Sequence, residues 1–258
     1  MKKPLMITRN LSKYFGGIKA LEEVSITIFE EQIVGLIGPN GSGKTTLFNV
    51  ITGFYMPDKG EILYRVENKD LIKINGLNPH EVFKLGIVRT FQIPRLFPSL
   101  TVLENLLIAP PNQIGEKILN AVRRKMWLKE EENLVKKAID LLTSFGKQDI
   151  IFKYPLELSV ADVKLIETLR GLMTPAKIYL LDEPLAGLDL PTARSLLSFI
   201  KELRDRYKLT FFVIEHRIDL LMEAVDHVYV LHNGRLLASG KPSEVMNNPD
   251  VIKAYVGG

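Results

Sequence analysis

A glycine-rich stretch near residue 40 constrains this chain more than any other part of its sequence. It reads Gly38-Pro-Asn-Gly-Ser-Gly-Lys-Thr45 and lies between an apolar run, 33–37, and a helix-like run that begins at Thr45. A strand, a turn of the form G-x-x-x-x-G-K-T and a helix N-terminus, in that order, predict a phosphate-binding loop. The glycines let backbone N–H groups wrap a triphosphate, and the helix dipole adds positive charge. Lys44 is then expected to reach the β- and γ-phosphates, and the Thr45 hydroxyl to ligate Mg²⁺.

A second motif, Ile178-Tyr-Leu-Leu-Asp-Glu-Pro184, is an apolar strand that ends in two carboxylates. Asp182 suits a metal ion, and Glu183 is placed to polarise an attacking water. Taken singly, Lys44 could be a solvated lysine beside a glycine turn, and the two acids an ordinary strand end. Neither interpretation explains why the two motifs occur together, and their combination predicts nucleotide hydrolysis.

Composition excludes several classes of protein. Of the 258 residues, 46% are hydrophobic and 25% charged, which is ordinary for a globular chain. No apolar stretch approaches the roughly 20 residues that span a bilayer, and the N-terminus lacks a signal peptide's apolar segment. The absence of cysteine fits a reducing cytoplasm. Because the net charge is only +4 and basic runs are answered by acidic ones, we expect no nucleic-acid partner.

The order of predicted elements indicates an α/β fold. Strands that alternate with helices predict a mostly parallel sheet, here a P-loop NTPase core. A β-rich layer, antiparallel in the expected fold, accompanies it. The strands expected in this layer are 5–8, 24–29, 61–65 and 72–74. Further strands are expected at 86–92, 209–214, 228–231 and 235–239, and helices at 159–174, 191–207 and 217–225, with a short C-terminal helix.

Residues 93–174 are predicted to form a helical subdomain inserted into the core, which comprises 1–92 and 175–258. The region opens with a proline-punctuated loop and continues with helical segments. One apolar stripe follows helical spacing and ends at a capping Gly146. Its members are Leu134, Ala138, Leu141, Leu142 and Phe145. Core packing or a partner helix explains this stripe better than a cofactor site does.

These features together resemble the ABC-type ATPases, and within them the LivG-type ATP-binding subunits of branched-chain amino acid importers. The resemblance covers nearly the whole chain. Its more specific parts are Arg89-Thr-Phe-Gln-Ile-Pro-Arg-Leu-Phe97, Thr101-Val-Leu-Glu-Asn105, Asp182-Glu-Pro-Leu-Ala-Gly-Leu-Asp189 and Asn248-Pro-Asp-Val-Ile-Lys-Ala-Tyr255.

The resemblance implies roles for several residues. Phe15, with Tyr14 as the competing choice, would stack on adenine, and Gln92 would sense Mg²⁺ and the attacking water. Glu183 would be the general base, and His216 would contact the γ-phosphate. The expected catalytic residues are therefore Glu183, His216 and Gln92, and the expected metal-binding residues are Thr45, Gln92 and Asp182. The expected nucleotide-binding residues are Phe15, Gly38, Pro39, Asn40, Gly41, Ser42, Gly43, Lys44, Thr45, Thr46, Ser159 and Asp189.

The chain departs from the family at one motif. Such ATPases are expected to close as head-to-tail dimers, each ATP lying between one P-loop and the partner's L-S-x-G-Q signature. Here the signature is Leu158-Ser-Val-Ala-Asp162, so Ala161 replaces a glycine and Asp162 a glutamine. An added Cβ and a carboxylate near a triphosphate would both weaken the partner's site. This asymmetry favours pairing with a different ATPase subunit; the alternative is a working variant in which Ser159 and the helix N-terminus suffice.

The expected function is that of an ATP-hydrolysing importer subunit, peripheral on the inner face of the plasma membrane, that powers integral permease subunits with ATP and Mg²⁺. Branched-chain amino acids are the expected cargo by resemblance alone. Three alternatives stay open: an ATPase subunit of an ABC transporter for another substrate, a weakly hydrolysing regulatory subunit of a heteromeric pair, and a soluble ABC ATPase of translation or DNA repair. The last is disfavoured because the chain has one ATPase core and no sustained heptads.

Overall fold

The fold was analysed in a computed structural model, which describes residues 3–66, 70–90, 96–111, 113–116 and 124–256. The chain divides into two compact units, and each is described by itself. The first unit comprises 1–89, 176–183 and 196–258, and the second comprises 90–175 and 184–195.

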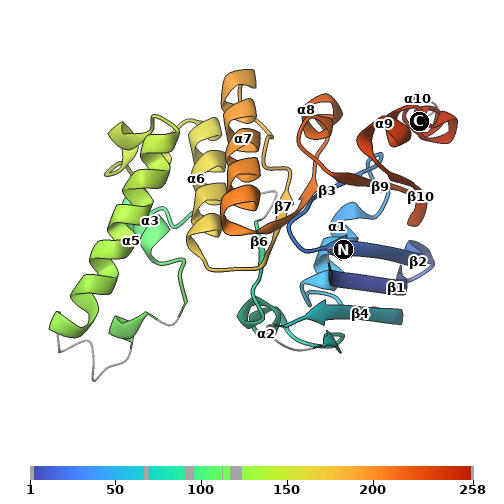
Figure 1. The fold of residues 1–258 in the computed structure, drawn as a ribbon, viewed down its shortest axis with the longest axis horizontal. Coiled ribbons are helices and arrows are strands. Elements are labelled where there is room, and N and C mark those ends of the chain that lie inside the picture. The colour runs from blue at the N-terminus through green and yellow to red at the C-terminus, as the bar shows by residue number, and fades with distance from the viewer. Residues whose placement is uncertain (1–2, 67–69, 91–95, 112, 117–123, 257–258) are drawn as a thin grey trace. The chain divides into compact units, whose positions relative to one another are not determined.

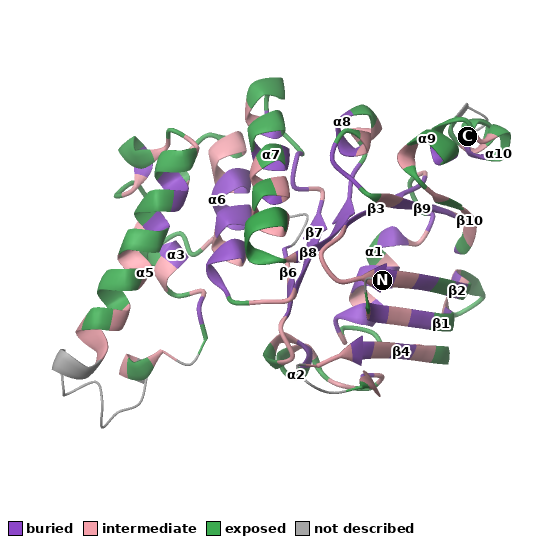
Figure 2. Cartoon of the chain, in the orientation of Figure 1, coloured by how far each residue is buried: buried purple, intermediate pink, exposed green. Residues whose placement is uncertain are grey.

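A six-stranded sheet forms the centre of the first unit, in the order β10-β9-β3-β8-β7-β6 (Figure 1). All neighbouring pairs are parallel except β9 and β10, which form an antiparallel hairpin. Strands β3, β7 and β8 are buried along their whole length, as Figure 2 shows, which explains their unbroken apolar sequences. The bounds are β3 Ile33–Ile37, β6 Ile87–Arg89, β7 Ile178–Asp182, β8 Thr210–Ile214, β9 His227–His232 and β10 Arg235–Gly240.

A second sheet of this unit is antiparallel, in the order β2-β1-β4-β5. Its strands alternate buried and less buried residues over much of their length, because one face packs on the core. The antiparallel β layer predicted from the sequence is therefore present. The strands are β1 Pro4–Phe15, β2 Ile18–Phe29, β4 Lys59–Arg65 and β5 Leu71–Lys73.

Helices cover both faces of the central sheet. Phe48 of α1 packs on Phe212 of β8 with ring centroids 5.1 Å apart. Val34 is the register partner of Phe212, so Gly35, the next residue, faces the opposite side. There a Cβ on Gly35 would lie 3.2 Å from Leu221 of α8. The helices of this unit are α1 Lys44–Ile51, α2 Pro79–Lys84, α8 Ile218–Met222, α9 Pro242–Met246 and α10 Pro249–Val256, together with α7 Leu190–Tyr207 from Leu196 onward.

The second unit is helical, as predicted. Helix α5 contacts both α3 and α6, and the predicted apolar stripe supplies its buried face, with Ala138, Leu141 and Leu142 buried. Gly146 follows the helix in a left-handed conformation, φ 62°, as the capping prediction requires. The helices are α3 Val102–Leu107, α5 Arg124–Ser144 and α6 Val160–Met173, with short 3₁₀ turns at 114–116, 148–150 and 155–157.

Three expectations need correction. Residues 184–195, predicted to belong to the core, group with the helical unit, because this segment packs on the start of α6: a Cβ on Gly187 would lie 3.8 Å from Val160. Of the strand predicted over 86–92, Ile87–Arg89 is a strand, and 91–92 lie outside the described residues. Helix α9 was not predicted, since it is only five residues long.

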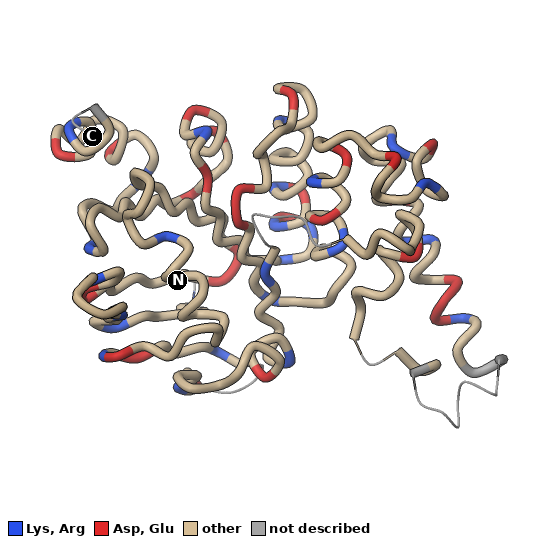
Figure 3. Tube along the Cα trace, turned by 180° about the vertical axis from the view of Figure 1, so that it is seen from behind, with Lys and Arg blue, Asp and Glu red and all other residues tan. Residues whose placement is uncertain are grey.

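Lysine and arginine segments alternate with acidic ones along the described chain (Figure 3). None of the described helices combines the length and the apolar character that crossing a membrane requires.

Candidate functional site

The glycine-rich loop connects the end of β3 to the start of α1, as predicted. Gly43 has φ 104°, which disfavours any other residue, and a Cβ there would lie 2.5 Å from the Ala20 carbonyl oxygen. A Cβ on Gly38 would lie 2.1 Å from the carbonyl oxygen of Leu231. These two glycines are therefore required by close backbone approach. Between them Asn40 and Gly41 are exposed at the tip of the loop.

Lys44 lies inside this loop rather than in solvent. Its Nζ donates hydrogen bonds to the carbonyl oxygens of Gly38 at 2.7 Å and Pro39 at 3.0 Å. The residue is only 6% exposed. Burial lowers the pKa of the Lys44 ammonium, and the negative charges of Glu183 and Asp182 oppose that shift. The lysine of the first motif and the acids of the second therefore act on one another, as their joint occurrence predicts.

The ends of three neighbouring parallel strands bring these groups together. The loop follows β3, Asp182 ends β7, and the segment after β8 carries His216. Because β3, β8 and β7 are adjacent and parallel, their carboxyl ends lie at one edge of the sheet. Ligands of open α/β sheets bind at this edge.

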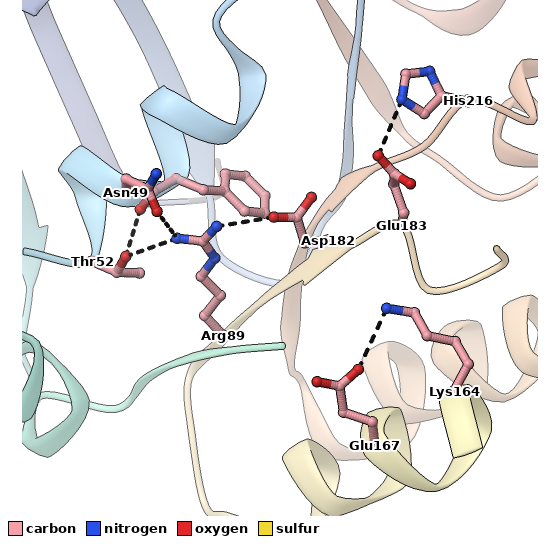
Figure 4. Close-up of polar contacts among 9 residues, drawn as sticks. Asn49, Thr52, Arg89, Lys164, Glu167, Asp182, Glu183 and His216 are labelled. Carbon is pink, nitrogen blue, oxygen red and sulfur yellow. Dashed lines mark hydrogen bonds and ion pairs between the residues drawn. The ribbon is translucent and has the colours of Figure 1, made fainter. Parts of the chain in front are cut away.

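Glu183 has a backbone conformation that is rare for its residue type. Its φ of 51° is left-handed, and its N–H donates to the carbonyl oxygen of Ile214 at 2.9 Å. Such conformations cost roughly 1–3 kcal/mol and cluster at functional sites. His216 Nε2 lies 3.1 Å from Glu183 Oε1, as Figure 4 shows. The predicted base and the predicted γ-phosphate contact are thus in direct contact.

Asp182 is almost fully buried and takes part in an ion pair. Its Oδ2 accepts a hydrogen bond from Arg89 Nη2 at 2.9 Å (Figure 4). Arg89 belongs to the quoted resemblance but received no role from the sequence; an arginine that ends an apolar strand is the signal that could have singled it out. A carboxylate here suits Mg²⁺, which prefers oxygen ligands.

The oxygen atoms available at this edge of the sheet suit Mg²⁺, with the phosphates of the nucleotide supplying the other ligands. Within the described ranges no group of three or more His, Cys, Asp or Glu side chains could hold a metal ion. Magnesium at phosphate sites is typically held by one or two protein oxygens together with substrate phosphates. Thr45, in the first turn of α1, and Asp182 are the predicted oxygen ligands.

Near the end of β1 an aromatic side chain is exposed beside a second ring. Phe15 is 41% exposed and meets Tyr55 edge-on, with centroids 5.1 Å apart. Tyr14 is partly buried, and its backbone N–H donates to Asp58 Oδ2 at 2.6 Å.

The divergent signature lies at the start of α6, in the second unit. Ser159 caps this helix: its Oγ accepts from the Asp162 N–H at 3.1 Å and donates to Asp162 Oδ2 at 2.7 Å. Lys147 Nζ lies 2.6 Å from Asp162 Oδ1, so the extra carboxylate has a cation beside it. Asp189 also belongs to this unit and is exposed, its carbonyl oxygen accepting from Ala193. Gln92 lies outside the described residues.

The C-terminal helix also touches the glycine-rich loop, a contact that sequence reasoning missed. Burial raises the pKa of the Tyr255 hydroxyl to about 12, against a backbone hydrogen bond from Gly38. Tyr255 lies within a quoted segment of the resemblance, but no periodicity connects it with residue 38.

Comparison with known proteins bears on this site. A family model described as ABC transporter matches residues 21–186, and one described as branched-chain amino acid ATP-binding cassette transporter matches 235–258. The probable branched-chain amino acid transport ATP-binding protein LivG of Archaeoglobus fulgidus is 44% identical over 254 residues, 98% of this chain and 95% of that protein. The high-affinity LivG protein of Escherichia coli is 37% identical, over 100% of this chain and 99% of that one.

Solved structures agree. The ADP conformation of an ATP-binding cassette of an ABC transporter has a TM-score of 0.80 and 39% identity, covering 99% of this chain and all of that one. A dimeric ATP-binding cassette bound to ADP and Pi has a TM-score of 0.76 and 26% identity, covering 92% and 99%. The fold class predicted from the sequence is confirmed. On the strength of its loop, its acidic strand end and these full-length relatives, the chain belongs to the ABC transporter family, as an ATP-hydrolysing, ATP-binding subunit of the LivG type.

Proposed function

We propose that this chain powers an importer of branched-chain amino acids by hydrolysing Mg²⁺-ATP on the inner face of the plasma membrane, docked on integral permease subunits. The cargo is inferred from the names of the full-length relatives and from the C-terminal match. Cargo does not touch the ATPase site, so the sheet edge supports hydrolysis, and the relatives support the substrate class.

One observation supports the proposed hydrolysis most directly: His216 Nε2 lies 3.1 Å from Glu183 Oε1. This pair lies at the sheet edge where the negative charges of Glu183 and Asp182 act on Lys44. Loop amides and Lys44 would bind the phosphates. Bound Mg²⁺ neutralises charge on the transferred phosphoryl group. Thr45 and Asp182 would hold that ion, and Glu183 would take the proton of the attacking water, with His216 orienting its carboxylate.

For the adenine base of ATP, we propose that Phe15 rather than Tyr14 provides the ring on which it stacks. Phe15 presents an exposed ring steadied edge-on by Tyr55, whereas Tyr14 is partly buried. Aromatic rings bind nucleobases through their faces, and an edge-on neighbour leaves a face accessible. Gln92 is proposed as the Mg²⁺ and water sensor on resemblance alone.

We also propose that the partner ATPase is a different subunit. In the signature, the Ser159 hydroxyl already donates its proton to Asp162, and Ala161 adds a Cβ where the family has a glycine. A partner with an intact signature would complete the site on this chain, while this chain would complete its partner's site less well. Asp189 and Ser159 would be the residues that it contributes across the dimer.

Isolation of the tagged chain from native membranes tests the assembly. The expected result is integral membrane proteins and a second ATP-binding chain, with ATPase activity in liposomes that rises when leucine, isoleucine or valine is supplied. Stimulation by another solute class alone would contradict the proposed cargo. A homodimer with vigorous turnover that Ser159→Ala leaves undiminished would contradict the heteromeric pairing.

A weakly hydrolysing regulatory role is the second candidate, favoured by Ala161 and Asp162 in the signature. Single-turnover hydrolysis by the assembled complex separates the two. A chain that binds ATP and converts none of it within many catalytic cycles of its partner's site would support the regulatory role.

A further inference from the structure

We propose that Arg89 is a positioning residue of the metal site: one guanidinium fixes Asp182, at the end of β7, relative to helix α1, which carries Thr45. The role rests on the proposed function, because it concerns the two side chains expected to hold Mg²⁺. It adds a residue that touches neither nucleotide nor water and acts through Asp182.

The first arm of the guanidinium binds the acid. Arg89 Nη2 donates to Asp182 Oδ2 at 2.9 Å, and the two side chains are 5% and 1% exposed. At such burial the pair is held with little competition from water, and the carboxylate orientation is fixed. The hydrogen bond uses one carboxylate oxygen, and a metal ion needs only one oxygen from this residue.

The second arm binds helix α1. Arg89 Nη1 donates to Asn49 Oδ1 at 2.7 Å and approaches Thr52 Oγ1 at 3.4 Å. Thr52 Oγ1 donates its own proton to the Phe48 carbonyl oxygen at 2.6 Å, so it can only accept from the arginine. The guanidinium also lies 5.5 Å from the centre of the Phe48 ring. Figure 4 shows Arg89 between Asn49 and Thr52 on one side and Asp182 on the other.

The two arms act on the two predicted ligands of one ion. Helix α1 is a continuous hydrogen-bonded segment from Lys44 to Ile51, so a restraint at Asn49 also restrains Thr45, four residues earlier. Arg89 itself is anchored in β6, where it is the register partner of Leu180 in β7. Arg89 therefore links helix α1 to the end of β7 through one side chain whose backbone is paired in the sheet.

Loss of the arginine has a predictable consequence. Without Arg89, the Asp182 carboxylate loses the hydrogen bond to Oδ2 that fixes its orientation, so it is free to turn away from the position that a metal ligand needs. Lysine would keep the charge but present a single ammonium group, which cannot bind Asn49 on one side and Asp182 on the other with the fixed geometry of a guanidinium. Charge alone is therefore expected to restore only part of the effect.

The test compares ADP affinity with magnesium chloride and with EDTA, by calorimetry on the full chain. The ratio of the two affinities, the magnesium gain, reports the metal site without any catalytic step. In Arg89→Met the gain is expected to fall about tenfold, the lower end of what outer-shell partners of metal ligands contribute, while affinity in EDTA stays nearly unchanged. Manganese(II) binding in the presence of ADP, followed by electron paramagnetic resonance, should weaken in parallel.

Matched variants separate positioning from stability. Arg204→Met removes a different Arg–Asp pair of the same unit, in which Arg204 Nη1 contacts Asp226 Oδ1 at 2.9 Å and Oδ2 at 3.0 Å, and should leave the gain unchanged. Arg89→Lys should lie between wild type and Arg89→Met. Asn49→Leu cuts only the second arm and should give a smaller loss. Adding Arg89→Met to Asp182→Ala should change nothing further, because the oxygen ligand is already gone.

Each result decides between the proposals. The positioning role would be overturned if Arg89→Lys and Asn49→Leu both kept the full magnesium gain. It would also be overturned if Arg89→Met lowered ADP affinity by the same factor in EDTA and in magnesium chloride. Either result would leave the proposed function standing. If Arg89→Met does not fold, the other two variants carry the test. A wild-type chain that binds no adenine nucleotide in either condition would instead contradict the proposed function itself.

Discussion

His216 Nε2 lies 3.1 Å from Glu183 Oε1, and the two residues come from the ends of adjacent parallel strands. Their environments differ, since the histidine side chain is 43% exposed and the glutamate 15%. In the proposed function the exposed ring would contact a ligand at the sheet edge, and its hydrogen-bond distance from Glu183 would let it orient the more sheltered carboxylate. The left-handed backbone of Glu183 adds a second constraint on where that carboxylate points.

His216→Ala is expected to lower the turnover number about 100-fold, the order of a general acid–base contribution, with little change in ATP affinity. The carboxylate would lose the group that orients it. Steady-state turnover and equilibrium binding on the assembled complex measure the two effects. His80→Ala, an exposed histidine at the start of α2, is the matched control and should change neither. Equal losses of turnover in both variants would contradict the assigned role.

Lys44→Met is expected to weaken ATP binding roughly 10- to 100-fold, as loss of charge-assisted hydrogen bonds to phosphate implies. The same change should leave the unfolding temperature unaltered or higher, because burial lowers the pKa of this ammonium and its desolvation opposes folding. Calorimetric binding and thermal unfolding test the pair of expectations. Lys59→Met, at an exposed lysine of β4, should affect neither. A Lys44→Met protein with unaltered affinity would argue against the phosphate contact.

Phe15→Ala is expected to weaken ATP binding about tenfold, since stacking on one base contributes roughly 1–3 kcal/mol. Binding of inorganic tripolyphosphate, which lacks a base, should stay constant. Tyr14→Ala serves as the comparison and is expected to affect ATP much less. The opposite order of the two variants would assign the platform to Tyr14.

The Lys147–Asp162 pair gives a pH-dependent stability. Burial raises the pKa of Asp162, but hydrogen bonds from Lys147 and Ser159 outweigh it and hold the pKa below the ordinary 3.8. A carboxyl group with a depressed folded-state pKa stabilises the protein above its unfolded pKa, and this contribution is lost as pH falls through the folded value.

Lys147→Met should therefore lower the free energy of unfolding by up to about 1 kcal/mol at neutral pH, the scale of a partly exposed pair. The difference from wild type should shrink below about pH 4, where the carboxyl group begins to be protonated. Urea unfolding at the two pH values measures it, with Lys136→Met, an exposed lysine of α5, as control. A difference that persists unchanged in acid would rule out the ion pair as its source.

Sequence reasoning identified the core of the fold because buried parallel strands leave unbroken apolar runs. The prediction 33–37 coincides with β3, since the apolar run ends at a glycine required by the loop. The strand predicted over 5–8 was too short, because β1 is observed as Pro4–Phe15. There the exposed Arg9 and Asn10 fall at a register shift between Thr8 and Leu11, so the alternation is interrupted although the pairing continues.

The residues of the candidate site were also predicted only where a local motif marked them. Local motifs predicted Lys44, Asp182 and Glu183, because each lies beside a glycine turn or a strand end. The contacts made by distant segments could not be predicted, since Arg89, which binds Asp182, precedes it by 93 residues, and Tyr255, which meets Gly38 of the loop, is also remote in the sequence. Likewise, the sequence indicated that Asp162 would repel a phosphate, but not that Lys147 lies beside it, because α5 and α6 are joined through a loop of irregular turns.

Glu183→Gln tests the central claim most directly, because it keeps the size of the side chain and removes only its ability to take a proton. In a single-turnover experiment on the assembled complex, the variant is expected to bind Mg²⁺-ATP with wild-type affinity and to hydrolyse it at least about 100-fold more slowly. Unchanged hydrolysis by that variant, with binding intact, would contradict the assignment of Glu183 as the base and with it the proposed site.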